Sequence, residues 1–257
     1  MQLSETTFII PTGEEITIRE TNGEDEDVIS RVGDASNGAS INKYISRIIR
    51  GTNIPGKTSM SELDVKNWPL ANKYFTLLKS RLQNAGNLLV FEFTCPHCSY
   101  KHPTPFEEDL SIYDWDLSKG NPPEDDPHSA TRIRKYPMGG QTEFKYTLTS
   151  GREISFELLS GKSEEYSLNK RREDISKNDE LRSRKLKFKS EQGEWVEVEN
   201  FRTFSTKEMS QIRGLVNKVD ISFNMESTIT CQNPRCGIIS TVPLIAIPAF
   251  FFPTEQI

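Results

Sequence analysis

Four cysteines are the residues of this sequence whose type and spacing suit metal chemistry. The 257-residue chain has no others, and they form two close pairs, Cys95 with Cys98 and Cys231 with Cys236. Short spacing places both sulfurs of a pair on one side of a turn, and zinc prefers four such ligands in a tetrahedron. Four thiolates leave no open coordination position, so the pattern predicts a structural zinc site. Four free buried cysteines, or a disulfide within the second pair, are the alternatives.

Two histidines near the first pair could also bind the metal. His97 and His102 could each replace a cysteine, but the full complement of four sulfurs makes ligation by either unnecessary. A tetrahedral four-sulfur site can hold iron as well as zinc, so the sequence leaves the metal open between these two.

An internal repeat with an offset of 138 residues explains why the two pairs lie far apart. Residues 12–23 recur as residues 150–161, with a glycine in second position and isoleucine three residues later. At the same offset Cys98 falls on Cys236, and the first cysteines of the two pairs match to within two residues. Self-similarity at a fixed offset indicates repeated structural units. We therefore expect each copy to supply half of one metal site.

In the first copy, local signals define the elements that lead to the first cysteine pair. We expect a hairpin with arms 8–11 and 16–19, a helix from about 24 to 32, helices over 41–49 and 70–85, and a strand over 88–93. Ser40 is expected to cap the second helix and Gly51 to end it. Pro69 and Gly86 should bound the third helix, because proline suits a helix start and glycine a helix end.

The second copy is predicted to follow the same order. We expect hairpins with arms 144–149 and 153–158, then 186–189 and 195–198, a helix through 209–216, and a strand over 219–230. Ser205 and Glu208 form a capping box at the start of that helix. Residues 163–184 have few apolar anchors, so a helix there would lie on the surface. Residues 238–252 are the most apolar part of the chain and should pack into the core or a partner.

These elements predict an α+β fold made of two related small modules. Each module would contain a hairpin, helices, a strand and a cysteine knuckle, and the two would share one four-cysteine, zinc-ribbon-like site. We place the first module at residues 1–102 and the second at 142–257. Residues 103–141 between them are rich in proline and acidic residues, which is typical of an irregular linker.

The charge and hydropathy of the chain argue against several classes of binding partner. The net charge is −5 and the mean hydropathy −0.57, which predicts a polar surface and argues against binding to nucleic acid or an anionic membrane. No apolar run approaches the length of a membrane-spanning helix, and the first residues lack the pattern of a secretion signal. We therefore expect the protein to remain in the cell that makes it, without a membrane partner.

The sequence offers little that could perform catalysis. None of the three histidines, His97, His102 and His128, lies beside a serine or acid in a familiar nucleophile arrangement. Residues 51–58 match the spacing of a phosphate-binding loop, but they follow a predicted helix and contain a proline, so an exposed turn is the better interpretation. We predict that the protein is not an enzyme. A site in the acidic residues 107–126 is the alternative.

The order of motifs resembles a family of phage proteins. It is carried by four stretches, Ile16–Arg19, Asn22–Asp27, Ile41–Gly51 and Phe91–Cys98. The chain resembles the baseplate hub and hub-assembly proteins of contractile-tailed phages of the T-even type. The resemblance covers mainly the first hundred residues and the second cysteine pair.

That resemblance implies a non-enzymatic structural or assembly subunit of a tail baseplate. Its partners would be other tail and baseplate proteins, and a second copy of the chain stays open as a partner. It would act in the host cytoplasm during assembly, and the finished virion is a further location that the resemblance allows. The alternative function is a zinc-ribbon adaptor that binds nucleic acid or a nucleic-acid enzyme.

Overall fold

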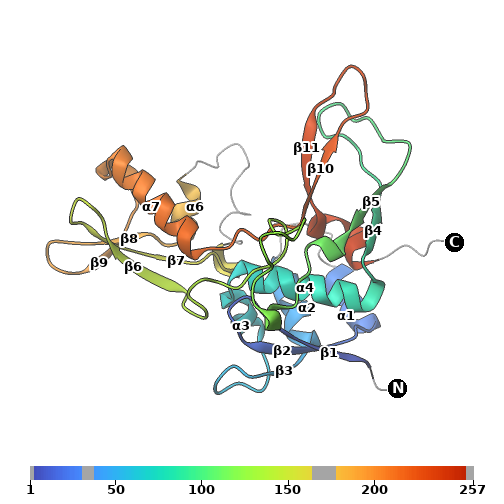
Figure 1. Cartoon of the computed structure of the whole chain (residues 1–257), viewed down its shortest axis with the longest axis horizontal. Helices are drawn as coiled ribbons and strands as arrows, with labels where there is room; N and C mark the ends of the chain where they lie inside the picture. Colours follow the sequence, from blue (N-terminus) through green and yellow to red (C-terminus); the bar gives the residue numbers. More distant parts are fainter. Residues whose placement is uncertain (1–2, 31–37, 164–177, 253–257) are drawn as a thin grey trace.

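The structure is a computed structural model that describes residues 3–30, 38–163 and 178–252. Within these ranges the chain combines helices with four antiparallel sheets (Figure 1). The mixture of helix and sheet that the sequence predicts is therefore confirmed.

The amino-terminal segment is built on a three-stranded sheet with the order β1-β2-β3. Its strands are β1 (Glu5–Ile9), β2 (Glu15–Arg19) and β3 (Ile49–Thr52). Helices α1 (Gly23–Ser30) and α2 (Gly38–Ile48) connect β2 to β3, and α3 (Glu62–Asn67) and α4 (Leu70–Ala85) follow. The helices lie over the sheet (Figure 1), and both contribute buried apolar side chains to the core, such as Ile16 of β2, Ile45 of α2 and Phe75 of α4. Pro69 and Gly86 flank α4, as predicted.

A second segment is built on a four-stranded sheet with the order β6-β7-β8-β9. Its strands are β6 (Glu143–Thr147), β7 (Glu153–Glu157), β8 (Lys187–Lys189) and β9 (Trp195–Glu197). Helix α6 (Asp179–Ser183) precedes β8, and η5 (Phe201–Thr203) and α7 (Thr206–Val219) follow β9. The predicted capping box is confirmed, because Ser205 and Glu208 exchange side-chain and backbone hydrogen bonds at the start of α7.

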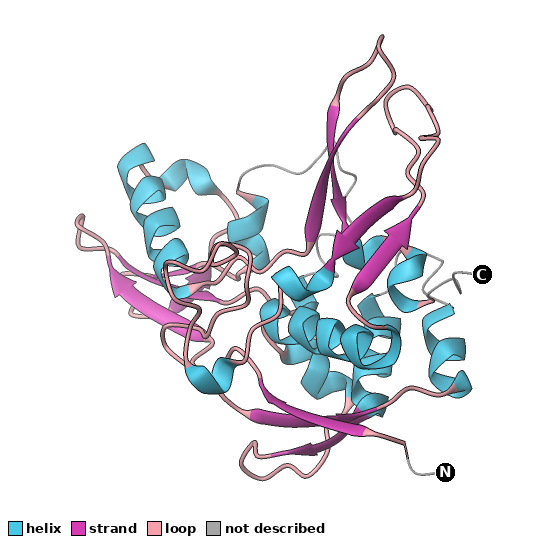
Figure 2. Ribbon diagram, turned by 45° about the vertical axis from the view of Figure 1, so that its right-hand side comes forward, coloured by secondary structure: helices cyan, strands magenta, loops and turns pink. Residues whose placement is uncertain are grey.

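Two hairpins project together from the rest of the molecule (Figures 1 and 2). One pairs β4 (Leu88–Phe91) with β5 (Phe106–Asp109), and the other pairs β10 (Glu226–Thr230) with β11 (Ile239–Pro243). Short helical turns follow them, namely η2 (Leu110–Ile112) and η3 (Leu117–Lys119) after β5, and η6 (Leu244–Ala246) and α8 (Pro248–Phe251) after β11.

The two segments share their order of elements and part of their strand register. In the first hairpin Glu5 pairs with Arg19, and in the other Glu143 pairs with Glu157. Each residue of the second pair lies 138 positions after its counterpart in the first pair. A third strand, β3 or β8, then pairs with the second strand of each hairpin. A helix, α4 or α7, follows and leads into a hairpin that carries two cysteines.

Three predicted boundaries are wrong. Ser40 does not cap α2, because the helix begins at Gly38 and already includes Ser40. Gly51 does not end a helix: α2 stops at Ile48, and β3 begins at the next residue because Ile49 pairs with Ile18 in the sheet. The strand predicted over 219–230 begins only at Glu226. Helix α7 continues to Val219 because that side chain extends the buried stripe of Ile212 and Val216. Most of the predicted surface segment 163–184, residues 164–177, lies outside the described residues.

The predicted linker contributes regular structure to the first hairpin. Strand β5 lies within residues 103–141 and pairs with β4, although three of its four residues are acidic. Further along, the Tyr113 hydroxyl donates a hydrogen bond to the carbonyl of Glu226, 2.9 Å away. The Tyr136 backbone N–H donates to the carbonyl of Pro11 at 2.9 Å. This stretch therefore links both cysteine hairpins and the first sheet.

A close backbone contact joins the two sheet segments. Pro69 forms a bridge with Ser160, and the Leu70 N–H donates to the carbonyl of Leu159 at 2.9 Å. A Cβ at the adjacent Gly161 would lie 2.9 Å from the carbonyl oxygen of Lys66 and 3.1 Å from the Lys73 ammonium nitrogen. Only glycine fits here without moving backbone.

We expect Gly161→Ala to lower the free energy of unfolding by about 1–3 kcal/mol, because overpacking forces local shifts. Gly214→Ala is the matched control, since a Cβ there would meet nothing within 4 Å and the residue lies within α7. Replacing a helical glycine by alanine should raise the stability by about 0.5–1 kcal/mol. Urea unfolding of the two variants measures both changes. Equal effects of the two substitutions would contradict the close contact at Gly161.

Candidate metal centre

Each cysteine pair lies in the loop at the end of a projecting hairpin. In the first loop the Cys95 N–H donates to the carbonyl of Tyr100 at 2.9 Å, and the Ser99 N–H donates to the carbonyl of Cys95 at 2.9 Å. In the second loop the Cys231 N–H donates to the carbonyl of Ile238 at 3.0 Å. These bonds close each loop so that both sulfurs of a pair face the same way.

The residue after the second cysteine has the same backbone conformation in both loops. Ser99 has φ of 57° and Gly237 has φ of 59°. This left-handed region costs glycine little but is rarely adopted by other residues. Ser99 is one of two non-glycine residues with positive φ in the described part of the chain, which indicates that the loop geometry imposes the conformation.

The four sulfurs form one compact group. All of them lie within 4.8 Å of one another. The sulfur of Cys95 is 3.9 Å from that of Cys236, and the sulfur of Cys98 is 3.7 Å from that of Cys231. These distances exceed a disulfide bond of about 2.05 Å, and all four cysteines are free. The predicted residues are therefore brought together, and they could hold a metal ion.

The four cysteines differ in how far the protein buries them. Cys95 and Cys231 are buried, whereas Cys98 is exposed and accepts a hydrogen bond at 3.6 Å from the side-chain amide of Asn233. A ligating sulfur commonly takes such a bond from an outer residue, which orients it. The buried pair fixes the site against the body of each hairpin, whereas Cys98 lies on the more exposed side of the site.

The protein shifts the pKa values of the individual thiols in different directions. Burial acts to raise the pKa of Cys95, but hydrogen bonds with the backbone N–H groups of His97 and Cys98 outweigh it and lower the pKa to about 7. Burial is also the largest influence on Cys231, and together with the neighbouring sulfurs it raises the pKa to about 12. Four adjacent thiolates would repel one another, so full deprotonation requires a cation at their centre.

Neither neighbouring histidine belongs to the sulfur group. His97 is exposed in the first loop. His102 is buried between aromatic rings, with ring centroids 5.3 Å from Phe93 and 5.1 Å from Phe106, and neither ring nitrogen has a hydrogen-bond partner among the described residues. His102 therefore contributes to the packing beneath the loop.

A buried arginine that the sequence did not single out positions the first hairpin. Arg81, near the end of α4, donates hydrogen bonds to the carbonyls of Gly86 and Leu88, at 3.2 and 2.8 Å. Burial lowers the pKa of this guanidinium, which has no carboxylate partner among the described residues. The bonds fix the angle between α4 and β4, and β4 leads directly to the first cysteine loop.

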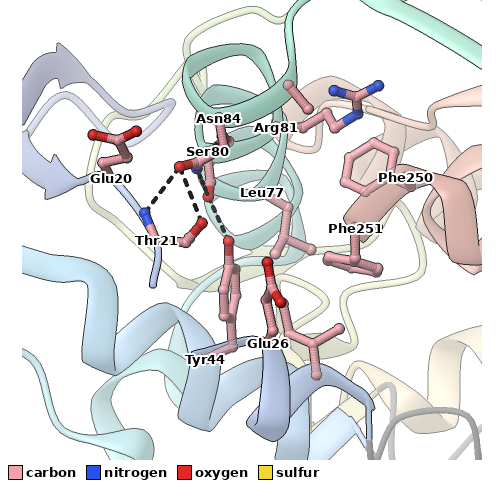
Figure 3. Close-up of a pocket in the computed structure, with 12 residues that line it drawn as sticks. Glu20, Thr21, Glu26, Tyr44, Leu77, Ser80, Arg81, Asn84, Phe250 and Phe251 are labelled. Carbon is pink, nitrogen blue, oxygen red and sulfur yellow. Dashed lines mark hydrogen bonds between the residues drawn. The ribbon is translucent and has the colours of Figure 1, made fainter. Parts of the chain in front are cut away.

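Arg81 also lines a hollow of about 240 Å³ between α1, α2, α4 and α8. Within it the Tyr44 hydroxyl lies 2.6 Å from the Ser80 hydroxyl, and the Asn84 amide oxygen accepts from both the N–H and the hydroxyl of Thr21 (Figure 3). These hydrogen bonds join α4 to α2 and to the segment that precedes α1.

Comparison with protein-family models, with curated proteins and with solved structures gives no significant match. The fold and the site define a mixed helix-and-sheet protein with a four-cysteine cluster that could bind a metal. Within the described ranges, no helix is both long enough and apolar enough to cross a bilayer.

Proposed function

We propose that the protein is a non-enzymatic structural or assembly subunit of a phage tail baseplate, stabilised by one structural zinc ion. The observation that carries the proposal is the closed set of four sulfurs contributed by two hairpins from distant parts of the chain. A site with four protein ligands has no position for a substrate, so its role would be to hold the hairpins together. The baseplate assignment rests on the resemblance of sequence motifs described above.

The sulfur geometry fits zinc. Sulfurs about 2.3 Å from a central zinc lie about 3.8 Å apart in a regular tetrahedron. The pairs at 3.7 and 3.9 Å approach that separation. A tetrahedral iron site would use the same ligands, so the metal itself must be measured. Cys95, Cys98, Cys231 and Cys236 would each supply one thiolate.

We further infer that the two segments arose by duplication of one module. Three observations support this: the common displacement of 138 residues in the hairpin registers, the shared order of elements, and the left-handed residue after the second cysteine of each loop. In a zinc-bound form, each module would provide two ligands. Small modules with little core of their own often need such a cross-link.

A zinc-ribbon adaptor for nucleic acid is less well supported by the charges around the site. Lys101 and Arg235 are the basic residues of the two hairpins, and Lys101 forms an ion pair with Glu92 at 2.7 Å. Strand β5 adds three acidic residues nearby. A nucleic-acid surface needs clustered positive charge to displace counterions, and these hairpins are acidic overall.

Co-purification tests the proposed function directly. The full zinc-loaded chain would be co-expressed with each tail and baseplate protein encoded in the same genome. We expect a stable complex with at least one of them, and we expect Cys95→Ser to weaken it because the hairpins would separate. His97→Ala is the matched control in the same loop. A chain that binds none of them but shifts DNA or RNA in a salt-sensitive manner would overturn the proposal in favour of the adaptor.

A further inference from the structure

The outer edge of strand β11 is open in the described structure. Strands β10 and β11 form a two-stranded sheet without a third strand. The carbonyl of Ile238 accepts from Cys231, and the Leu244 N–H donates to the carbonyl of Met225. Along an antiparallel strand, residues whose backbone N–H and C=O point toward the partner strand alternate with residues whose groups point away. The two bonds therefore show which residues of β11 bond to β10 and which do not. The backbone groups of Ile239 and Thr241 therefore point away from β10.

This edge has little of what usually protects an exposed strand. Natural proteins place charged side chains, prolines or bulges on such edges. No charged residue occurs between positions 237 and 254, and the register of β11 is regular along its length. Proline appears only at the last residue, Pro243. Two adjacent apolar side chains are also exposed, Ile238 by 42% and Ile239 by 64%.

We propose that β11 pairs antiparallel with β11 of a second copy of the chain. A register centred on Ser240 would place Ile239 opposite Thr241 of the second copy. The outward N–H and C=O groups of these two residues would then hydrogen-bond to each other across the interface. The pairing is isologous, so it closes as a dimer and does not extend into a filament. The result is a four-stranded sheet with the order β10-β11-β11-β10.

The charge pattern of β11 suits a second copy as the occupant of this edge, because it contains nothing that would repel its own copy. Across a two-fold axis each strand meets its own sequence, so any charged residue near the axis faces a like charge and destabilises the pair. Strand β11 contains none. The neighbouring hairpin strand β5 carries Glu107, Glu108 and Asp109, which would repel their own copies. A two-stranded ribbon is marginal by itself, and a four-stranded sheet is more stable.

The proposal concerns self-association and does not depend on the baseplate assignment. Sedimentation velocity of the full zinc-loaded chain, over a wide concentration range, tests it. We expect the mass to rise from 29.3 kDa towards twice that value as concentration increases.

Two edge variants and one control separate strand pairing from other contacts. Thr241→Pro removes an outward N–H but no bond to β10, and Ile239→Lys places a charge on the edge. Each should raise the dimer dissociation constant at least about tenfold. Thr241→Val keeps the N–H and the branched side chain and should dimerise normally. Circular dichroism and metal content would show whether each variant is folded. If Thr241→Pro does not fold, Ile239→Lys alone tests the proposal.

A wild-type chain that stays monomeric at every concentration would overturn the proposal. Folded Thr241→Pro and Ile239→Lys variants that dimerise as well as wild type would also overturn it, because the contact would then lie elsewhere.

Discussion

Cys231→Ser is expected to abolish stable metal binding. The variant removes one of the four sulfurs that lie within 4.8 Å of one another, and Cys231 is one of the two that are buried. Loss of a direct ligand should lower metal affinity by more than the roughly 10- to 100-fold lost when an outer-shell partner is removed. Elemental analysis of the purified chain should give one zinc for wild type and almost none for the variant.

The same variant should lose the dependence of stability on metal. A metal that binds only the folded chain stabilises it by mass action, so each tenfold rise in free zinc above the dissociation constant should raise the wild-type folding constant about tenfold. Urea unfolding at buffered zinc concentrations would measure this slope, which should vanish in Cys231→Ser. The two hairpins would then lack the ion that we propose joins their ends.

His97→Ala is the control for this experiment because it changes the same region without removing a sulfur. His97 is exposed and lies outside the sulfur group, so the variant should keep one zinc and the full dependence of the folding constant on zinc concentration. If His97→Ala loses the metal and Cys231→Ser retains it, the ligand set proposed here is wrong. A wild-type chain that contains iron would keep the ligand set but change the metal.

Local signals in the sequence identify the elements that support the site. The limits of α4 follow from Pro69 and Gly86, because each residue acts on the backbone of its own turn. The capping box at Ser205 is local for the same reason. The cysteine pairs can be found because their spacing is short and because the pattern recurs at a fixed offset.

Contacts between different elements of the fold could not be predicted from the sequence. Gly51 looks like a helix end until Ile49 is seen to pair with Ile18, and the acidic strand β5 looks like a linker until it pairs with β4. Arg81 looks like an ordinary surface residue of a helix, but the turn after α4 covers it and accepts its hydrogen bonds. In each case the deciding partner lies on another element.

A buried ion cluster in the first segment leads to the second large effect. The carboxylate of Asp25 is fully buried, and it binds Arg19 at 2.6 Å and Arg47 at 2.9 Å. In the sequence Asp25 belongs to an acidic run that suits the exposed first turn of a helix. In the structure α1 turns this one side chain inward, so that it joins β2 to α2.

Asp25→Asn should lower the free energy of unfolding by about 3–5 kcal/mol, because removing one partner of a buried pair leaves the other charge uncompensated. The uncompensated group would be Arg19, which is only 5% exposed. Glu24→Gln is the matched control: Glu24 is 81% exposed, and its ion pair with Arg47 should contribute less than about 1 kcal/mol. Urea unfolding near neutral pH measures both variants.

The pH dependence of stability gives an independent check on this cluster. Burial acts to raise the pKa of Asp25, but hydrogen bonds with Arg19, Arg47 and the backbone of Asn22 outweigh it and hold the pKa below its usual value of 3.8. Because the folded-state pKa is depressed, the ionised carboxylate stabilises the fold at every pH above 3.8. That contribution is lost as the pH falls below 3.8 through the folded-state pKa. Wild type should therefore lose more stability than Asp25→Asn between neutral pH and pH 3, so the difference between them should shrink. An unchanged difference would show that Asp25 acts through shape and not through its charge.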